Sequence, residues 1–152
     1  MSIDVRIDLG MIAAKLSQDL SGLAASDDLH IGTSFDNDFT TLYAKRTPAV
    51  WVLAQRIVPI SSGGGFSGAF RQKMSVEVMT QIIVARSRPG VYNNEAQMST
   101  IHTAVINSIL GWRPNNGDGV FKFGVTQDGK SGEPLTTTLQ SFKIETSRTL
   151  QT

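Results

Sequence analysis

Apolar and polar positions follow a helical period in two segments of the chain. In the first segment, apolar residues recur at steps of three and four, which places them on one face of a helix. They are Leu9, Ile12, Ala13, Leu16, Leu20 and Leu23. We expect this helix to span residues 5–24. In the second segment the corresponding positions are Met98, Ile101, Val105 and Ile109. Asn93 or Asn94 is expected to cap this second helix, and Gly111 stands where a helix commonly ends.

A period of two predicts the longest strand, over residues 70–85. Its even positions are mostly apolar and its odd positions mostly polar, as in a strand with one buried face. An apolar run at 49–54, between Pro48 and Pro59, predicts a buried strand. The glycine- and serine-rich segment 61–68 joins the two. We expect this segment to be the loop of a long hairpin, outside any strand ladder and mobile at its tip.

The remaining predicted strands are shorter. Residues 29–35 and 39–44 predict two of them, with a turn of short acidic and amide side chains between them. Two more strands end the chain, one at 121–126 and one from Leu135 onward. In the strand at 121–126 every second residue from Phe121 is apolar, which predicts a single apolar face.

The last strand changes its apolar parity partway along. Leu139 belongs to one alternation of apolar residues, and Phe142 belongs to the other. An extra residue in one strand shifts the alternation in this way, so we expect a β-bulge near Gln140–Ser141.

The order of elements (helix, strands, helix, strands) predicts an α+β fold. We expect a mainly antiparallel, or mixed, β-sheet packed by two α-helices, with a long β-hairpin. No internal repeat or linker divides the sequence. A length of 152 residues with 40% hydrophobic content suits a single domain over residues 1–152.

Composition excludes several classes of protein. The 14 Lys and Arg residues nearly balance the 13 Asp and Glu residues, so bulk charge gives no reason to expect a dedicated nucleic-acid binder. There is no cysteine, which excludes disulfide frameworks, thiolate nucleophiles and cysteine-ligated metals. No leader or membrane-spanning segment is predicted, and we expect the chain to fold in a cytoplasm. Charged residues make up only 18% of the chain, which fits association with copies of itself or with partners and equally fits an ordinary domain with a neutral polar surface.

No pattern of catalytic or cofactor-binding residues is present. The two histidines, His30 and His102, have no neighbouring ligand at metal spacing. The glycines of 63–68 lack the lysine and the following helix of a phosphate loop. Asp36-Asn37-Asp38 lacks the later glycine and glutamate of a calcium loop. The sequence therefore predicts no enzyme, no catalytic residue, no cofactor and no metal.

Positive charge gathers on the long predicted strand and its exit, at Arg71, Lys73, Arg86 and Arg88. One interpretation is that these residues solubilise the open face of a sheet and discourage edge pairing. The other is contact with an acidic partner surface or with passing DNA. Glu77 interrupts the stripe, which favours the first interpretation.

Several segments, in their order along the chain, resemble the tail terminator proteins of long-tailed bacteriophages. The second helix ends in Leu110-Gly111-Trp112-Arg113-Pro114 and is followed by a loop with glycine and aspartate. The strand Pro48-Ala49-Val50-Trp51-Val52-Leu53 is similar to one of that family, as is the long strand that begins with Arg71-Gln72. A final strand with Phe142 and then Glu145-Thr146 completes the order, so the resemblance covers roughly residues 5–148. The segment 27–47 departs from it, being longer and more strand-like.

The resemblance implies a structural virion protein. Such proteins form a homo-hexameric ring that caps the end of the tail tube, stops tube polymerisation and provides the attachment surface for the neck of the filled head. The implied partners are the tail tube protein and a neck or head-completion protein, with DNA only passing through the ring lumen. No membrane is involved, and the implied location is the tail–neck junction of the virion, assembled in the host cytoplasm.

The hairpin tip is the expected interface, either with another subunit or with the tube. Its residues are Gly63, Gly64, Gly65, Phe66, Arg71 and Lys73. Two other functions remain open: another head–tail connector or neck protein of similar fold, and a small-ligand-binding enzyme on the same scaffold.

Overall fold

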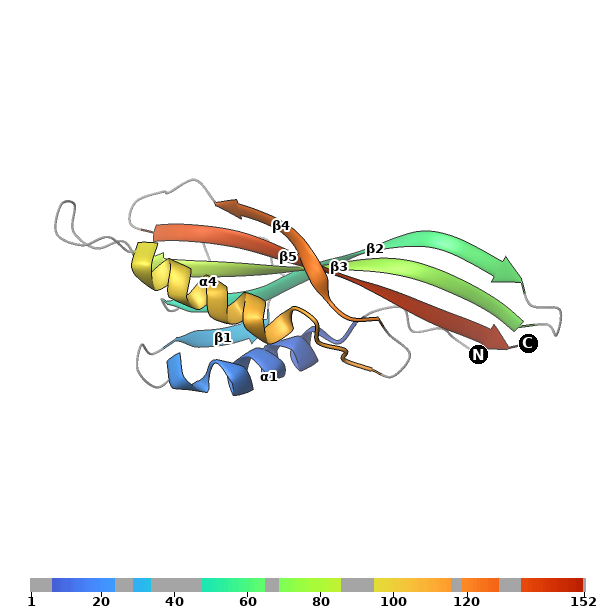
Figure 1. Cartoon of the computed structure of the whole chain (residues 1–152), viewed down its shortest axis with the longest axis horizontal. Coiled ribbons are helices and arrows are strands. Elements are labelled where there is room, and N and C mark those ends of the chain that lie inside the picture. Colours follow the sequence, from blue (N-terminus) through green and yellow to red (C-terminus); the bar gives the residue numbers. More distant parts are fainter. Residues whose placement is uncertain are drawn as a thin grey trace.

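Two long helices cover one face of a five-stranded sheet (Figure 1). The computed structural model describes residues 7–23, 29–33, 48–64, 69–85, 95–115, 119–128 and 135–151. The elements, labelled as in Figure 1, are α1 (Leu9–Asp19), β1 (His30–Thr33), β2 (Ala49–Gly64), β3 (Ala69–Ala85), α4 (Glu95–Ile109), β4 (Lys122–Asp128) and β5 (Leu135–Gln151). This arrangement confirms the predicted α+β fold.

The strand order is β1-β2-β3-β5-β4, and the sheet is mixed. β1 pairs with β2 in parallel, and the other three pairings are antiparallel. β2 and β3 form the predicted long hairpin. β5 returns along the whole length of β3, from Leu135 beside Ala85 to Gln151 beside Ala69.

The main core lies between the helices and the sheet. Both predicted helical stripes point into it: Leu9, Ile12, Leu16 and Leu20 from α1 and its end, and Met98, Ile101, Val105 and Ile109 from α4, are all buried. The sheet contributes Val50, Val52, Val76, Val78, Ile82, Val84, Phe142 and Ile144. The hydrophobic periods in the sequence therefore identified the buried face of each of these elements.

The first helix begins later than predicted, at Leu9 instead of residue 5. Asp8 has extended backbone, and its Oδ1 accepts a hydrogen bond from the Gly10 amide at 2.9 Å, which makes it the N-cap. Just before this cap, Ile7 is tied to the sheet, because its amide donates to Gln55 Oε1 and its carbonyl accepts from Gln55 Nε2. After Asp19 a further helical turn follows at residues 21–23.

The prediction that Pro59 bounds the second strand is wrong, because β2 continues to Gly64. Beyond Val52, no described strand pairs with the outer side of β2. A proline lacks an amide donor, but an edge strand tolerates one where its nitrogen faces away from the sheet. Gly63 and Gly64 were expected in the hairpin loop, outside any ladder; they are instead paired with Arg71 and Phe70.

The predicted β-bulge lies in β4 and not in β5. Every residue of β5 from Leu135 to Gln151 has its partner in β3, with no shift of register. The shift occurs between Phe123 and Thr126 of β4, where two residues stand opposite the single residue Ser141.

The parity change in β5 has another cause, which is burial on both faces of the sheet. Phe142 and Ile144 face the helices. Leu139 packs instead on a second apolar cluster on the opposite face, formed by Ala49, Trp51, Leu53 and Ile83. A strand that is buried on both faces is apolar at both parities, so the pattern in β5 imitates a bulge.

The single apolar face predicted for β4 is also wrong. Phe121, just before the strand, stacks on Trp112 with ring centroids 5.9 Å apart and is buried in the main core. Phe123 and Val125 are exposed. β4 is the last strand of the sheet, so its side chains have a neighbouring strand on one side only.

Gly111 ends α4 as predicted, with a positive φ of 80°. Its amide donates to the carbonyl of Phe121 at 2.8 Å, and the amide of Phe121 donates back to the carbonyl of Trp112 at 3.0 Å. Trp112 is half-buried and packs against the main core. The segment after the helix is therefore bound directly to the chain entering β4.

Several sequence predictions fall outside the described residues. These are the strand at 39–44 and the turn before it, the caps Asn93 and Asn94, Gly65 and Phe66 of the hairpin loop, and Arg86 and Arg88. The other short strand, predicted at 29–35, is confirmed by β1.

Replacing Gly111 by alanine should destabilise the protein by roughly 1–2 kcal/mol, because an L-residue adopts positive φ at that cost. A Cβ at this position meets nothing within 4 Å, so the loss is conformational and not steric. Gly111→Asn should lose less, since asparagine tolerates this conformation. Urea unfolding of both variants measures the difference; equal losses would contradict the backbone argument.

The pKa of Asp19 is lowered, first by the hydrogen bond that Ser108 Oγ donates to its Oδ2 at 2.7 Å and then by Lys15, whose Nζ lies 2.9 Å from that oxygen. A lowered carboxyl pKa stabilises the fold above its ordinary range, and the contribution is lost as the pH falls through the lowered value. Ser108→Ala should raise the pKa of Asp19, as NMR titration of its carboxyl would show. Thr103→Ala, at an exposed position of α4, is the control that should leave that pKa unchanged.

Candidate interaction surface

Three strands project beyond the helices as a curved ribbon (Figure 1). We call this ribbon the arm and define it as residues 55–64 of β2, 69–78 of β3 and 142–151 of β5. Its strands are in register, since Val78 pairs with Gln55 on one side and with Phe142 on the other. The arm exists because β2, β3 and β5 are each 16 or 17 residues long, whereas α1 and α4 cover only the other half of the sheet.

The base of the arm is anchored to the core on its helix-facing side. Ile57, Val76 and Ile144 form one row across the three strands, and all three contact the main core. In the next row, Met74 and Thr146 are buried. The arm therefore continues the core layer and is not a detached loop.

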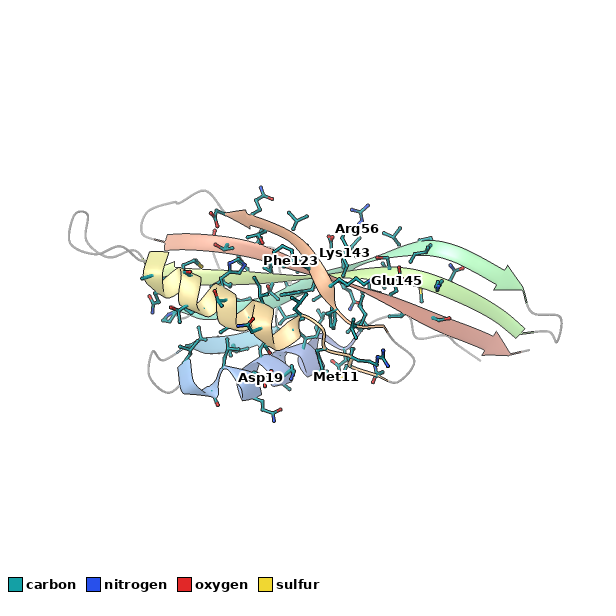
Figure 2. The ribbon with its side chains drawn as sticks, viewed as in Figure 1. Met11, Asp19, Arg56, Phe123, Lys143 and Glu145 are labelled. Atoms are coloured by element: carbon teal, nitrogen blue, oxygen red, sulfur yellow. The ribbon has the colours of Figure 1, made fainter. Side chains whose placement is uncertain are left out.

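The opposite face of the arm carries a row of charges. Arg56 of β2 stands beside Glu77 of β3, which stands beside Lys143 of β5. Lys143 Nζ lies 3.9 Å from Glu77 Oε2, and both side chains are partly exposed, so this ion pair contributes little stability. Lys122 of β4 extends the row. Figure 2 shows Arg56, Lys143 and Glu145 near the point where the arm leaves the helix-covered part.

Two exposed apolar pairs lie on different strands. Val58 and Ile60 of β2 are 41% and 48% exposed, and Phe123 and Val125 of β4 are 50% and 59% exposed. Side chains of this size are usually covered in a folded protein, and clusters of them on a surface commonly mark contacts with partners.

The bulge in β4 brings two backbones unusually close. A Cβ built on Gly124 would lie 2.6 Å from the carbonyl oxygen of Ser141, a distance that only glycine allows. The Val125 amide donates to Ser141 Oγ at 2.7 Å, so the serine side chain takes up a donor that the bulge withdraws from the ladder. Gly124 and Ser141 together fix the position of Val125.

The predicted interface residues are only partly brought together. Gly63 and Arg71 are direct cross-strand partners near the far end of the arm, and Gly64 follows on β2. Lys73 is exposed and stands beside Ser61 and Ser147, two residue pairs closer to the helices than Arg71. The described residues thus place four of the six predicted positions on the distal part of the arm.

Sequence reasoning did not identify Val58, Ile60, Phe123 or Val125 as surface residues. Val58 and Ile60 were expected next to a strand end at Pro59. Phe123 and Val125 were expected on an apolar face of their strand. Gly124, between Phe123 and Val125, could have indicated the bulge in this strand, because an isolated glycine in a strand often marks one.

The polar groups near α4 form a structural network. His102 Nε2 lies 2.7 Å from Oε1 of the buried Gln140, and the hydroxyl of Thr126 donates to the same oxygen. Gln140 Nε2 donates to the carbonyl of Ser141 at 2.8 Å. The network joins α4 to β4 and β5, and Gln140 uses both ends of its amide within it.

The other histidine lies at the opposite edge of the sheet. The ring of His30 on β1 packs against Trp51, with centroids 5.0 Å apart. Within the described ranges, no three His, Asp or Glu side chains are grouped so that they could hold a metal ion. These contacts give both histidines packing roles.

No protein-family model matches this chain, and no curated protein matches it. None of the described helices has the length and apolar character to cross a membrane.

Gly124→Ala should destabilise the protein by roughly 1–3 kcal/mol, because the new Cβ collides with a backbone atom that cannot rotate away. Gly22→Ala is the matched control, since a Cβ there meets nothing within 4 Å. Chemical denaturation of both variants tests this, and an unchanged midpoint for Gly124→Ala would mean that β4 does not approach Ser141 as described.

Proposed function

We propose that this chain is a phage tail terminator: a structural virion protein that forms a ring on the end of the tail tube. In this function the ring stops tube polymerisation and offers the attachment surface for the neck of the filled head. The partners are further copies of the chain in a hexamer, the tail tube protein and a neck protein, with DNA passing through the lumen.

The observation that carries the proposal is the arm. A three-stranded ribbon that extends past the helices adds little to the core of its own subunit beyond the rows of Val78, Ile57 and Met74. A subunit of such a ring must contact its neighbouring subunits and the tube on which the ring sits. A ribbon that projects from the subunit can make such contacts. The exposed Val58 and Ile60 on this ribbon are suited to burial in an assembly.

The resemblance described above gives the second support. The residues that carry it have structural roles in this fold. Gly111 and Trp112 fix the end of α4, Val50 and Val52 lie in the core, and the strand containing Arg71-Gln72 runs the length of the arm.

The distal arm is the part that we assign to the tube. Gly63 and Gly64 lie there in the ladder opposite Arg71 and Phe70, and Lys73 is exposed nearby. Positive charge at the end of a projecting element favours contact with an acidic surface. We therefore expect an acidic surface on the rim of the last tube ring.

Stopping the gene with an early nonsense codon in the phage or prophage that encodes it should give overlong or irregular tails that are not joined to filled heads. The reason is that nothing then blocks addition of further tube subunits. Electron microscopy of the particles measures both tail length and joining. Expression of the intact chain from a plasmid should restore normal particles and serves as the control.

Two other outcomes would change the assignment. Unjoined tails of normal length would indicate a neck protein with no terminating role. Normal, joined particles would remove both structural functions and return attention to ligand binding.

A further inference from the structure

The first residues of the sequence alternate strictly between apolar and polar side chains. Met1, Ile3, Val5 and Ile7 are apolar, and the residues between them are polar. A period of two is typical of an extended segment with one apolar face. Residues 1–6 lie outside the described part of the chain, but Ile7, from which they lead, is placed by the structure.

Two hydrogen bonds to Gln55 fix the backbone of Ile7 at the base of the arm. The Ile7 amide donates to Gln55 Oε1 at 2.9 Å, and its carbonyl accepts from Gln55 Nε2 at 2.8 Å. A side-chain amide that bonds both groups of one residue imitates the peptide group of a neighbouring strand. Gln55 pairs with Val78, whose side chain lies in the main core, so Gln55 and Ile7 meet on the helix-facing side of the sheet.

The position of Ile7 puts the arm within reach of the residues before it. α1 begins at the end of the helical layer nearer the arm and runs away from the arm (Figure 1). An extended chain rises about 3.3 Å per residue, so six residues span about 20 Å. With Ile7 opposite Gln55, steps of two residues bring Val5 to the row of Ile57 and Ile3 to the row of Pro59 and its partner Met74.

The helix-facing side of the arm is buried, although both helices lie over the other half of the sheet (Figure 1). Met74 and Thr146, which are cross-strand partners in the arm, are only 4% and 2% exposed. The Thr146 hydroxyl is buried and has no hydrogen-bond partner among the described residues. A buried hydroxyl without a partner is costly. This row therefore requires a cover that supplies apolar side chains and a backbone polar group, and an extended segment has both.

We propose that residues 1–6, which we call the N-terminal segment, lie extended along the helix-facing side of the arm of their own chain. Ile3 packs over the row of Met74 and Thr146, and Val5 packs over the row of Ile57. A backbone group of the segment bonds the Thr146 hydroxyl. The inference does not depend on the proposed function.

The tether at Gln55 selects the arm of the same chain. A segment held next to a surface meets that surface at a far higher effective concentration than the same surface on another molecule. With this side of the arm covered, the opposite side is the broad face left open to partners. Arg56, Val58 and Lys143 are exposed there, because their rows have the opposite parity to Ile57 and Met74.

Deletion of residues 2–6 tests the cover through methionine oxidation. A covered thioether is out of reach of hydrogen peroxide, so Met74 should oxidise several-fold faster in the shortened chain than in the parent. Met98 is buried in the main core on α4 and should keep its slow rate, which serves as the internal control for an intact fold. Mass spectrometry of peptides measures both methionines in one sample.

A pair of point variants tests the predicted parity of the segment. Ile3→Asp places a carboxylate against the row of Met74 and should accelerate Met74 oxidation, as the deletion does. Ser2→Asp introduces the same side chain one residue away, on the polar side of the segment, and should leave the rate as in the parent. Both variants keep the whole chain, so they also test the proposal if the shortened chain fails to fold.

A nitroxide at Ser2→Cys tests which chain is covered. The sequence has no cysteine, so this is the only thiol to label. In the labelled chain the NMR signal of the Met74 methyl group should broaden, and that of Met98 should not. Mixing spin-labelled chains without isotope with isotope-labelled chains without the nitroxide should leave the Met74 signal sharp, because the contact is within one chain.

The proposal is overturned if Met74 keeps its slow oxidation when residues 2–6 are absent, or if Ser2→Asp and Ile3→Asp accelerate it equally. Broadening of Met74 in the mixed sample would show that the segment covers the arm of another copy, which also contradicts the proposal. Normal tails in the nonsense mutant would remove the terminator function and leave all three results unchanged.

Discussion

The antiparallel ladder between β3 and β5 runs without interruption from the pair Ala69–Gln151 to the pair Ala85–Leu135. The other elements depend on it. β2 is held by β3 and β4 is held by β5. α4 packs on the half of the ladder that lies away from the arm, and α1 packs on α4, β1 and β2. Because the ladder is longer than the helical layer, the sheet continues as an arm with little cover of its own. The features on which the proposed function rests follow from this difference in length.

Among the described strands, the shifts of register all lie in β2 and β4, on either side of that ladder. β2 has shifts of register after Val52 and after Pro59, and β4 has one at Gly124. Bulges and prolines at sheet edges hinder uncontrolled pairing with other strands. They also re-aim side chains, and in this chain the exposed Ile60 and Val125 lie at such shifts. Such edges favour contact through side chains over backbone pairing with a strand of another molecule.

Local periodicity predicted the segments whose burial is one-sided. The helical stripes of α1 and α4 and the alternation of β3 before Ile83 appear in the sequence because each packs one face on the main core. Prediction was wrong where burial or pairing depends on distant segments. Leu139 is buried by Trp51 and Ile83 on the second face, which the sequence of β5 cannot reveal. From the local sequence alone, Pro59 is predicted to end a strand. It lies inside β2 because, among the described residues, no strand pairs with the outer side of β2 at that position.

By itself, the sequence determined the α+β class, the faces of the helices, the glycine end of α4 at Gly111, and the absence of thiol chemistry. It also indicated part of the candidate surface, at Gly63, Gly64, Arg71 and Lys73, because glycine and charge are visible in a linear chain. Only the tertiary structure decided that Val58 and Phe123 lie exposed on opposite edges of one sheet. Their positions depend on strand order, and strand order is set by the pairing of residues far apart in the chain, which no local pattern encodes.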